Sequence, residues 1–332
     1  MSAPAPLAIS TGDPAGIGPE LIALCWAQRD AESLAPFFVV GGADLLRAAA
    51  ASRGLDMPVV RIGSPAEAAE CFARALPVLG VEDCTYTPGE PSPEGARFAL
   101  GSLTRATQLA IEGAGALVTG PVAKSHLANV GFKHPGQTEF VAEACGVAPD
   151  DAVMMLAGPS LRTIPLTIHI ALADVPNVLT SDLIVRRARV TARSLQRDFG
   201  IEQPRLALCG LNPHAGEDGR FGDEEQRIII PAIEALRAEG IAVTGPHPAD
   251  TLFAPRERSG FDVAFGMYHD QALIPIKTLD FDSGVNVTLG LPIVRTSPDH
   301  GTAFAIAGKN KASPGAMIAA VRMAGECAAR RI

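Results

Sequence analysis

The stretch "FDVAFGMYHDQALIPIK" (residues 261–277) begins as a buried β-strand and then changes character. Its apolar run 263–265 is followed by His269, Asp270 and Gln271, and later by Lys277. An imidazole, a carboxylate and an amide have no packing reason to end an apolar segment, so a turn, a metal ligand and an acid–base site are the interpretations to weigh. In open α/β sheets, functional side chains lie just beyond the carboxyl ends of the strands.

Short apolar runs alternate with helical segments on both sides of this stretch. Their order predicts an α/β fold with a mainly parallel sheet, and 332 residues favour two lobes over one core. Strands are expected at 5–10, 37–42, 116–122, 162–172, 205–213 and 241–246. Helices are expected at 20–28, 43–54, 96–113, 181–200 (Ser181 and Asp182 at its start, Gly200 after its end) and 223–240.

The composition is that of a globular protein with a large core, because 47% of the residues are apolar and 19% are charged. A net charge of −8 without a basic block argues against a nucleic-acid partner. The N-terminus lacks the features of a signal peptide, and no run approaches the ~20 apolar residues of a membrane span. The six scattered cysteines form no C-x-x-C pair, which favours reduced thiols and a cytoplasmic location.

Three histidines follow strand-like apolar runs: His169, His214 and His269. Each alone is readily explained as a turn residue, but strand ends in one sheet converge in space. Convergent imidazoles with a carboxylate suit a borderline metal such as zinc or cobalt. Asp250 follows another predicted strand and is a candidate fourth ligand, with a helix N-cap as the alternative.

Lys277, Asn286 and Arg295 recur at nine-residue intervals in an apolar, glycine-rich region. Two cations and an amide are suited to a phosphate or carboxylate ligand; the alternative is pairing with Asp280 or Asp282. The glycine-rich segment "STGDPAGIGPE" (10–20) lacks the third glycine of a dinucleotide fingerprint.

Six segments together resemble the 4-hydroxythreonine-4-phosphate dehydrogenase family of vitamin B6 (pyridoxine) biosynthesis. They are "STGDPAGIGPE", "VTGPVAKSHL", "PGQTEF", "GLNPHAGEDGRFGDEE", "MYHDQALIPIK" and "GVNVTLGLPIVRTSPDHGTAFAIAGK". The first and last are also similar to isopropylmalate and isocitrate dehydrogenases, which implies their two-domain α/β/α fold with a cleft. The lobes expected from that similarity are residues 1–125 with 280–332 (cofactor side) and residues 126–279 (metal-ligand and dimerisation side).

The resemblance implies a role for each matching position. The metal ligands are His169, His214, Asp250 and His269, contributed by two subunits of a homodimer. The substrate contacts are Gln137, Thr138, Lys277, Asn286 and Arg295. Lys277 and His214 are the expected catalytic residues, and His300 and Gly301 the expected cofactor contacts. The family usually carries histidine where this chain has Gln137. Unlike an imidazole, an amide cannot become cationic or transfer a proton.

The implied activity is an oxidoreductase using NAD or NADP and one divalent metal (zinc, magnesium or cobalt). It oxidises 4-phosphooxy-L-threonine to a β-keto acid, which decarboxylates to 3-amino-2-oxopropyl phosphate. Relatives acting on erythronate or threonate 4-phosphate, or on cyclic dihydrodiol dicarboxylates, are the nearest alternatives. A phosphate acyltransferase and a non-catalytic metal-binding protein are the alternatives from other classes.

Overall fold

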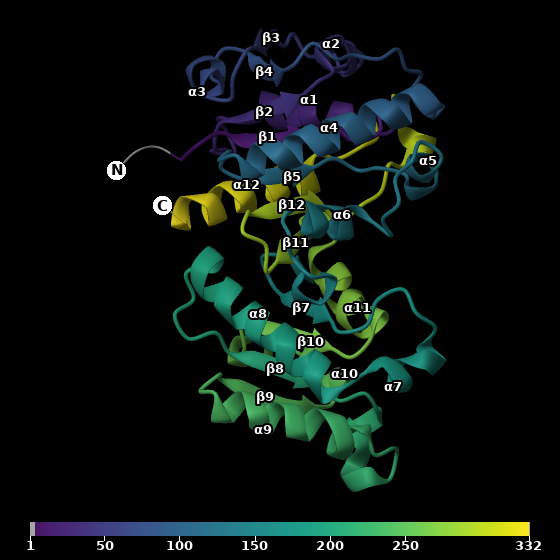
Figure 1. Ribbon diagram of the computed structural model, residues 1–332, viewed down its shortest axis with the longest axis vertical. Coiled ribbons are helices and arrows are strands. Elements are labelled where there is room, and N and C mark those ends of the chain that lie inside the picture. Colours follow the sequence, from purple (N-terminus) through teal and green to yellow (C-terminus); the bar gives the residue numbers. More distant parts are fainter. Residues whose placement is uncertain (1–3, 332) are drawn as a thin grey trace. The chain divides into compact units, whose positions relative to one another are not determined.

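The computed structural model describes residues 4–331, drawn as a ribbon in Figure 1. Its strands are β1 (Leu7–Ser10), β2 (Phe37–Val40), β3 (Val59–Ile62), β4 (Leu76–Leu79), β5 (Leu117–Thr119), β6 (Val153–Ala157), β7 (Arg162–Pro165), β8 (Leu206–Cys209), β9 (Val243–His247), β10 (Val263–Gly266), β11 (Val285–Leu289) and β12 (Arg295–Pro298). Its α-helices are α1 (Gly18–Ala27), α2 (Ala43–Ser52), α3 (Glu67–Cys71), α4 (Pro93–Ile111), α5 (Lys124–Ala128), α6 (Gln137–Ala144), α7 (Val175–Val178), α8 (Ser181–Phe199), α9 (Ile230–Ala238), α10 (Ala249–Leu252), α11 (His269–Asp280) and α12 (Gly315–Arg330).

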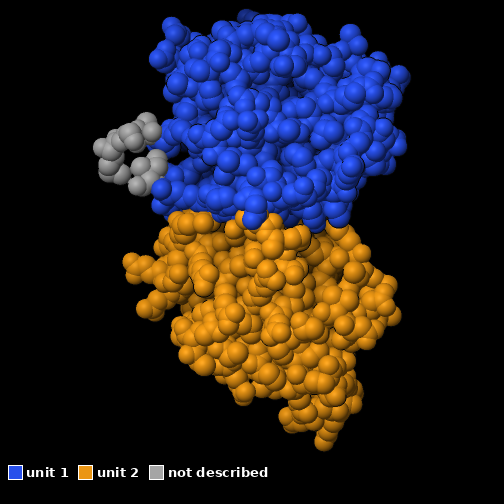
Figure 2. Space-filling model, in the orientation of Figure 1, with its two compact units in different colours: residues 1–146, 291–332 blue, residues 147–290 orange. Residues whose placement is uncertain are grey.

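The chain divides into two compact units, coloured separately in Figure 2. Unit 1 comprises residues 1–146 and 291–332, and unit 2 comprises residues 147–290. The lobe limits expected from the sequence, 125/126 and 279/280, remain a prediction about the parts that carry cofactor and metal.

Unit 1 contains strands in the order β3-β4-β2-β1-β5-β12. Every pairing among them is parallel. All their carboxyl ends therefore lie along the same edge, where an α/β sheet places its ligands. The long helices α4 and α12 pack on the central strands β1 and β5.

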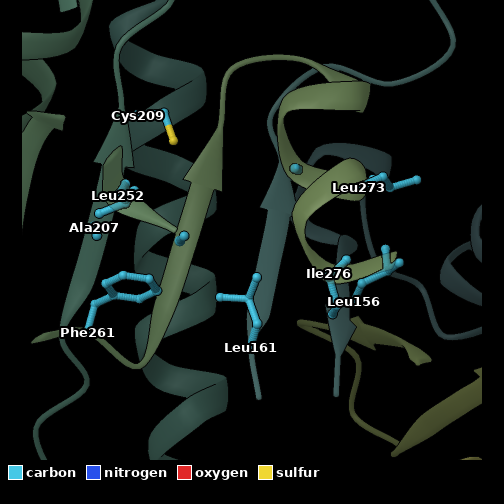
Figure 3. Close-up of a cluster of buried hydrophobic side chains, with 10 residues drawn as sticks. Leu156, Leu161, Ala207, Cys209, Leu252, Phe261, Leu273 and Ile276 are labelled. Carbon is cyan, nitrogen blue, oxygen red and sulfur yellow. The ribbon is translucent and has the colours of Figure 1, made fainter. Parts of the chain in front are cut away.

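Unit 2 contains strands in the order β11-β6-β7-β10-β8-β9. β6 is antiparallel to both β11 and β7, whereas β7, β10, β8 and β9 are parallel. The predicted α/β class with a mainly parallel sheet is thus confirmed in both units. In unit 2, α11 and α10 cover the parallel strands through a buried apolar cluster that includes Leu156, Phe261 and Ile276 (Figure 3).

Local signals explain where several elements end. α8 starts at Ser181, as predicted. The residue before it, Thr180, is the N-cap, and its hydroxyl accepts a hydrogen bond from the amide of Leu183. The helix ends at Gly200, which adopts the left-handed conformation (φ 68°) expected of glycine there. β7 stops at Pro165, so the strand predicted over 162–172 was too long. The helix predicted from residue 223 begins instead with a π-helical turn, Glu225–Ile229, before α9.

Two further sequence expectations concern the chain's surroundings. No helix among residues 4–331 is long and apolar enough to cross a membrane. None of the six cysteines, all within residues 4–331, forms a disulfide, and burial raises the pKa of the Cys84 thiol to about 11. The cytoplasmic location remains a prediction.

Candidate active site

The four predicted metal ligands follow four neighbouring parallel strands of unit 2. His169 follows β7, His269 follows β10, His214 follows β8 and Asp250 follows β9. Since carboxyl ends of adjacent parallel strands share one edge, these side chains belong to the same rim of the sheet. The sequence pattern that selected them is explained by this topology.

His169 and His269 lie close together. Their ring centroids lie 5.8 Å apart, with the planes inclined by 39°. Both rings line a cavity of about 320 Å³, together with Tyr268 and Asp270. The Asp270 carboxylate is 2.7 Å from Nδ1 of His269, an arrangement that leaves the opposite ring nitrogen, Nε2, to bind a metal. The donor chemistry therefore fits a divalent ion, although among residues 4–331 no three such side chains form a group that could hold one within a single chain.

The backbone around His214 adopts an unusual left-handed turn. Residues 214–218 all have positive φ angles (52°, 51°, 81°, 42° and 57°), and only Gly216 among them is a glycine. Left-handed geometry costs a non-glycine residue roughly 1–2 kcal/mol, so surrounding contacts must hold this turn. The glycines of "NPHAGEDGRFG" signalled a rigid turn, but they did not reveal its handedness or the residues that stabilise it.

Gln271 connects two of these strand ends. Its side-chain oxygen accepts a hydrogen bond from the amide of Met267 (2.7 Å), and its nitrogen donates to the carbonyl of Gly210 (2.8 Å). The side-chain amide of Gln271 therefore links the end of β10 to the end of β8 by hydrogen bonds. His269 itself is the first residue of α11, so the strand ends before the polar residues begin.

Unit 1 contains a buried cation, Arg295. The residue is 3% exposed, and its guanidinium donates hydrogen bonds to the hydroxyls of Thr119 (2.7 Å) and Thr138 (3.5 Å). Desolvation lowers its pKa to about 10, while the charge of Glu139 acts in the opposite direction. A desolvated guanidinium beside neutral hydroxyls is suited to binding an anionic ligand.

Gln137 lies beside this cation at the start of α6. Its side-chain nitrogen donates to the carbonyl of Gly120 (3.2 Å), whereas its buried Oε1 has no hydrogen-bond partner among residues 4–331. An unsatisfied buried oxygen is costly, so a hydrogen-bond donor on a ligand at this position would be favourable. Gln137, Thr138 and Arg295 thus meet in unit 1.

Lys277 and Asn286 belong to unit 2. Lys277 lies in the last turn of α11. Asn286 lies in β11, and within the described part of the chain its buried Oδ1 has no hydrogen-bond partner. Asp280, which the sequence offered as an alternative partner for the cations, accepts a hydrogen bond from the amide of Ser160 (3.0 Å). The regular sequence spacing therefore does not reflect one shared secondary-structure element.

The glycine-rich segment 10–20 contacts the segment that carries His300 and Gly301 through the backbone. The amide of Ile17 donates to the carbonyl of Thr302 (2.9 Å), two residues after His300. Nδ1 of His300 is 3.1 Å from the carbonyl of Gly301, and no described residue forms a hydrogen bond with its buried Nε2. This unsatisfied nitrogen is consistent with a ligand contact in the segment where the sequence predicts the cofactor.

Asp13 and His126 were not singled out from the sequence. Asp13 is 3% exposed, and its carboxylate accepts a hydrogen bond from the amide of Ala15 and lies 3.9 Å from Nδ1 of His126. Burial raises the pKa of Asp13, partly offset by the Ala15 amide and by His126. Asp13 lies three residues after the end of β1, and this strand-end position is the sequence signal that could have identified it.

Comparison with known proteins shows the family of this chain. The profile of the family described as "Pyridoxal phosphate biosynthetic protein PdxA" matches residues 33–324. The chain belongs to this family. It is 63% identical, over 98% of its length and 97% of the relative, to a 4-hydroxythreonine-4-phosphate dehydrogenase of Erythrobacter litoralis. It is 56% identical to the protein of the same name from Zymomonas mobilis, over 98% of this chain and 96% of that one.

Solved structures of similar proteins share the fold. A 4-hydroxythreonine-4-phosphate dehydrogenase from Klebsiella pneumoniae matches with a TM-score of 0.87 and 40% identity, covering 98% of this chain and 99% of that chain. A terephthalate 1,2-cis-dihydrodiol dehydrogenase from Burkholderia xenovorans matches less closely, with a TM-score of 0.67, 29% identity and 98% coverage of both chains. The predicted family and the enzyme class, a dehydrogenase, are confirmed.

Proposed function

We propose that this PdxA-family chain oxidises 4-phosphooxy-L-threonine with NAD⁺ and a divalent metal. The β-keto acid so formed decarboxylates to 3-amino-2-oxopropyl phosphate, a step of pyridoxine 5′-phosphate biosynthesis. The observation that carries the proposal is the rim of unit 2, where His169, His269, His214 and Asp250 follow four adjacent parallel strands. The full-length similarity to 4-hydroxythreonine-4-phosphate dehydrogenases supports the choice of substrate.

The chain's own residues bind and orient the substrate. Arg295 and Thr138 hold an anionic group, since a buried guanidinium that donates hydrogen bonds to two hydroxyls is suited to an anionic ligand. Gln137 presents its free Oε1 to a donor on the substrate. When bound, the metal supplies a Lewis acid and the dinucleotide a hydride acceptor. Fixed contacts at both ends of a small substrate restrict it to the reactive geometry.

Lys277 and His214 are proposed as the catalytic residues. Lys277 contacts the substrate's anionic end together with Asn286 and is a candidate acceptor for the hydroxyl proton. His214 acts as a metal ligand with His169, His269 and Asp250. The buried, unsatisfied Nε2 of His300 and the adjacent Gly301 support a cofactor contact in that segment. Zinc, magnesium and cobalt, and NAD and NADP, remain the candidate metals and dinucleotides.

A homodimer with the active site at its interface is part of the proposal. Large apolar side chains are exposed beside the metal histidines: Leu172 is 65% exposed near His169, and Phe221, 49% exposed, has its ring centroid 6.2 Å from that of His214. Phe281, just after α11, is 75% exposed. Exposed apolar groups concentrated around a site mark a protein interface. A second subunit would also supply the ligands that one chain does not bring together.

The substrate is tested by a panel assay on the metal-loaded, full-length protein. NADH absorbance would be followed with 4-phosphooxy-L-threonine, erythronate 4-phosphate, threonate 4-phosphate and a cyclic dihydrodiol dicarboxylate. The highest kcat/KM is expected for 4-phosphooxy-L-threonine, with release of CO₂. Preference for any of the other three would keep the dehydrogenase class and refute the proposed substrate.

A further inference from the structure

The left-handed turn 214–218 passes close to one buried carboxylate, that of Glu225, at Gly216. Glu225 is 2% exposed, and among residues 4–331 both hydrogen bonds to its carboxylate come from Asn212: the backbone amide at 2.8 Å and the side-chain nitrogen at 3.0 Å. Burying a carboxylate without a cationic partner is unfavourable. Its retention at this position therefore needs a reason beyond packing.

Two glycines, Gly216 in the turn and Gly210 at the end of β8, show how closely the backbone approaches this carboxylate. A Cβ added to Gly216 would lie 2.7 Å from Oε2 of Glu225. A Cβ added to Gly210, at the end of β8, would lie 3.1 Å from Oε1 and 2.7 Å from the Cα of Ala215. A side chain at either glycine would therefore crowd the Glu225 carboxylate, which lies between the turn and the end of β8.

Two backbone irregularities meet at Glu225. It is the first residue of the π-helical turn Glu225–Ile229, and its carboxylate faces the left-handed residues 214–218. Both irregularities are less stable than regular helix, and such features persist mainly where function requires them. The next residue back, Glu224, also accepts a hydrogen bond from the Asn212 side chain (2.7 Å), so Asn212 is fixed between two carboxylates.

We propose that Glu225, held by Asn212, is a positioning residue for the metal ligand His214. The carboxylate fixes the left-handed turn, and the turn fixes the direction in which the exposed imidazole leaves the backbone. The inference rests on the proposed function, because it assumes that His214 binds metal. It assigns the position of that ligand to a residue eleven places along the chain that itself contacts no metal.

The test measures Zn²⁺ affinity of the full-length protein by competition with a chromophoric chelator, and the melting temperature without metal. Glu225→Gln retains an acceptor for the Asn212 amide, whereas Glu225→Ala removes the carboxylate. Both should remain folded and bind Zn²⁺ about 10- to 100-fold more weakly, the usual effect of losing a partner that orients a metal ligand. Glu234→Gln, on the exposed face of α9, is the matched control and should bind normally.

A rescue separates a backbone role from a charge effect. Ala215 has φ 51°, a conformation that glycine adopts without steric strain. Adding Ala215→Gly to Glu225→Ala should restore part of the lost affinity. No rescue, or wild-type affinity in both folded Glu225 variants, would overturn the positioning role. If His214→Ala alone binds Zn²⁺ normally, the metal site of the proposed function fails, and the positioning role fails with it.

Discussion

The imidazole rings of His169 and His269 face one another with centroids 5.8 Å apart, although they follow different strands, β7 and β10. The Asp270 carboxylate lies 2.7 Å from Nδ1 of His269. Carboxylate, imidazole and metal form a recurrent series in which the carboxylate fixes the ring orientation and raises ligand basicity. This pair is the most complete part of the proposed metal site within one chain.

Replacing either histidine should remove most metal binding. For His169→Ala and His269→Ala we expect Zn²⁺ affinity to fall by more than about 100-fold, the upper end of what loss of an outer partner costs. Asp270→Asn should cause a smaller loss, since Nδ1 keeps a hydrogen-bond partner. Isothermal titration on the apo-protein measures all three. Equal, small losses would mean that the rings pack together without binding metal.

Arg295 should be essential for the substrate and dispensable for folding. Arg295→Met removes a charge-assisted contact worth about 1.5–3 kcal/mol, so kcat/KM should fall roughly 10- to 150-fold. Because burial depresses the pKa of this guanidinium, its charge does not stabilise the empty site. The melting temperature without ligand should therefore stay level or rise. A lower melting temperature with unchanged kcat/KM would assign Arg295 a structural role.

A negative charge at position 137 should repel the substrate anion. Gln137→Glu is nearly isosteric, and its carboxylate would take the place of an amide beside the buried Arg295. We expect KM for the phosphorylated substrate to rise by at least tenfold, with little change for NAD⁺. Gln203→Glu, at an exposed loop position, is the control for net charge. An unchanged KM would place the substrate away from α6.

Asp13 should make stability depend on pH. Its folded-state pKa is raised, chiefly by burial, so its contribution favours the folded state below the unfolded pKa near 3.8 and is lost as pH rises through the folded value. Asp13→Asn keeps an acceptor for the Ala15 amide and should melt at a higher temperature at pH 7. The gain should shrink toward pH 4. Asp30→Asn, at an exposed site, should show neither effect. A lower melting temperature at pH 7 would contradict the desolvation argument.

The sequence was sufficient to predict the strand-end residues because their information is local. A strand's apolar run and the polar residue after it are visible in the chain, and parallel topology brings such ends to one edge. His169, His214, His269 and Asp250 were placed there by this reasoning. Gly200 was identified as the residue ending α8 for the same local reason, since glycine accepts the left-handed conformation.

Features set by distant contacts were not predictable. Nothing near His214 in the sequence shows that residues 214–218 turn left-handed, and Glu225, which we propose fixes that conformation, lies eleven residues further along the chain. The π-helical turn Glu225–Ile229 was predicted as ordinary α-helix. A π-helix differs from an α-helix by one residue in its hydrogen-bond spacing, and five residues are too few to show this in the sequence pattern. The strand expected to reach His169 ends at Pro165, before the polar residues begin.

The most direct measurement is NADH formation from 4-phosphooxy-L-threonine by metal-loaded wild-type protein and by His214→Ala under the same conditions. The account predicts metal-dependent turnover by the wild type, abolished by a chelator and restored by added metal, and no turnover above background by the variant. Full turnover by His214→Ala without metal would contradict the central claim that the strand-end histidines form the catalytic metal site.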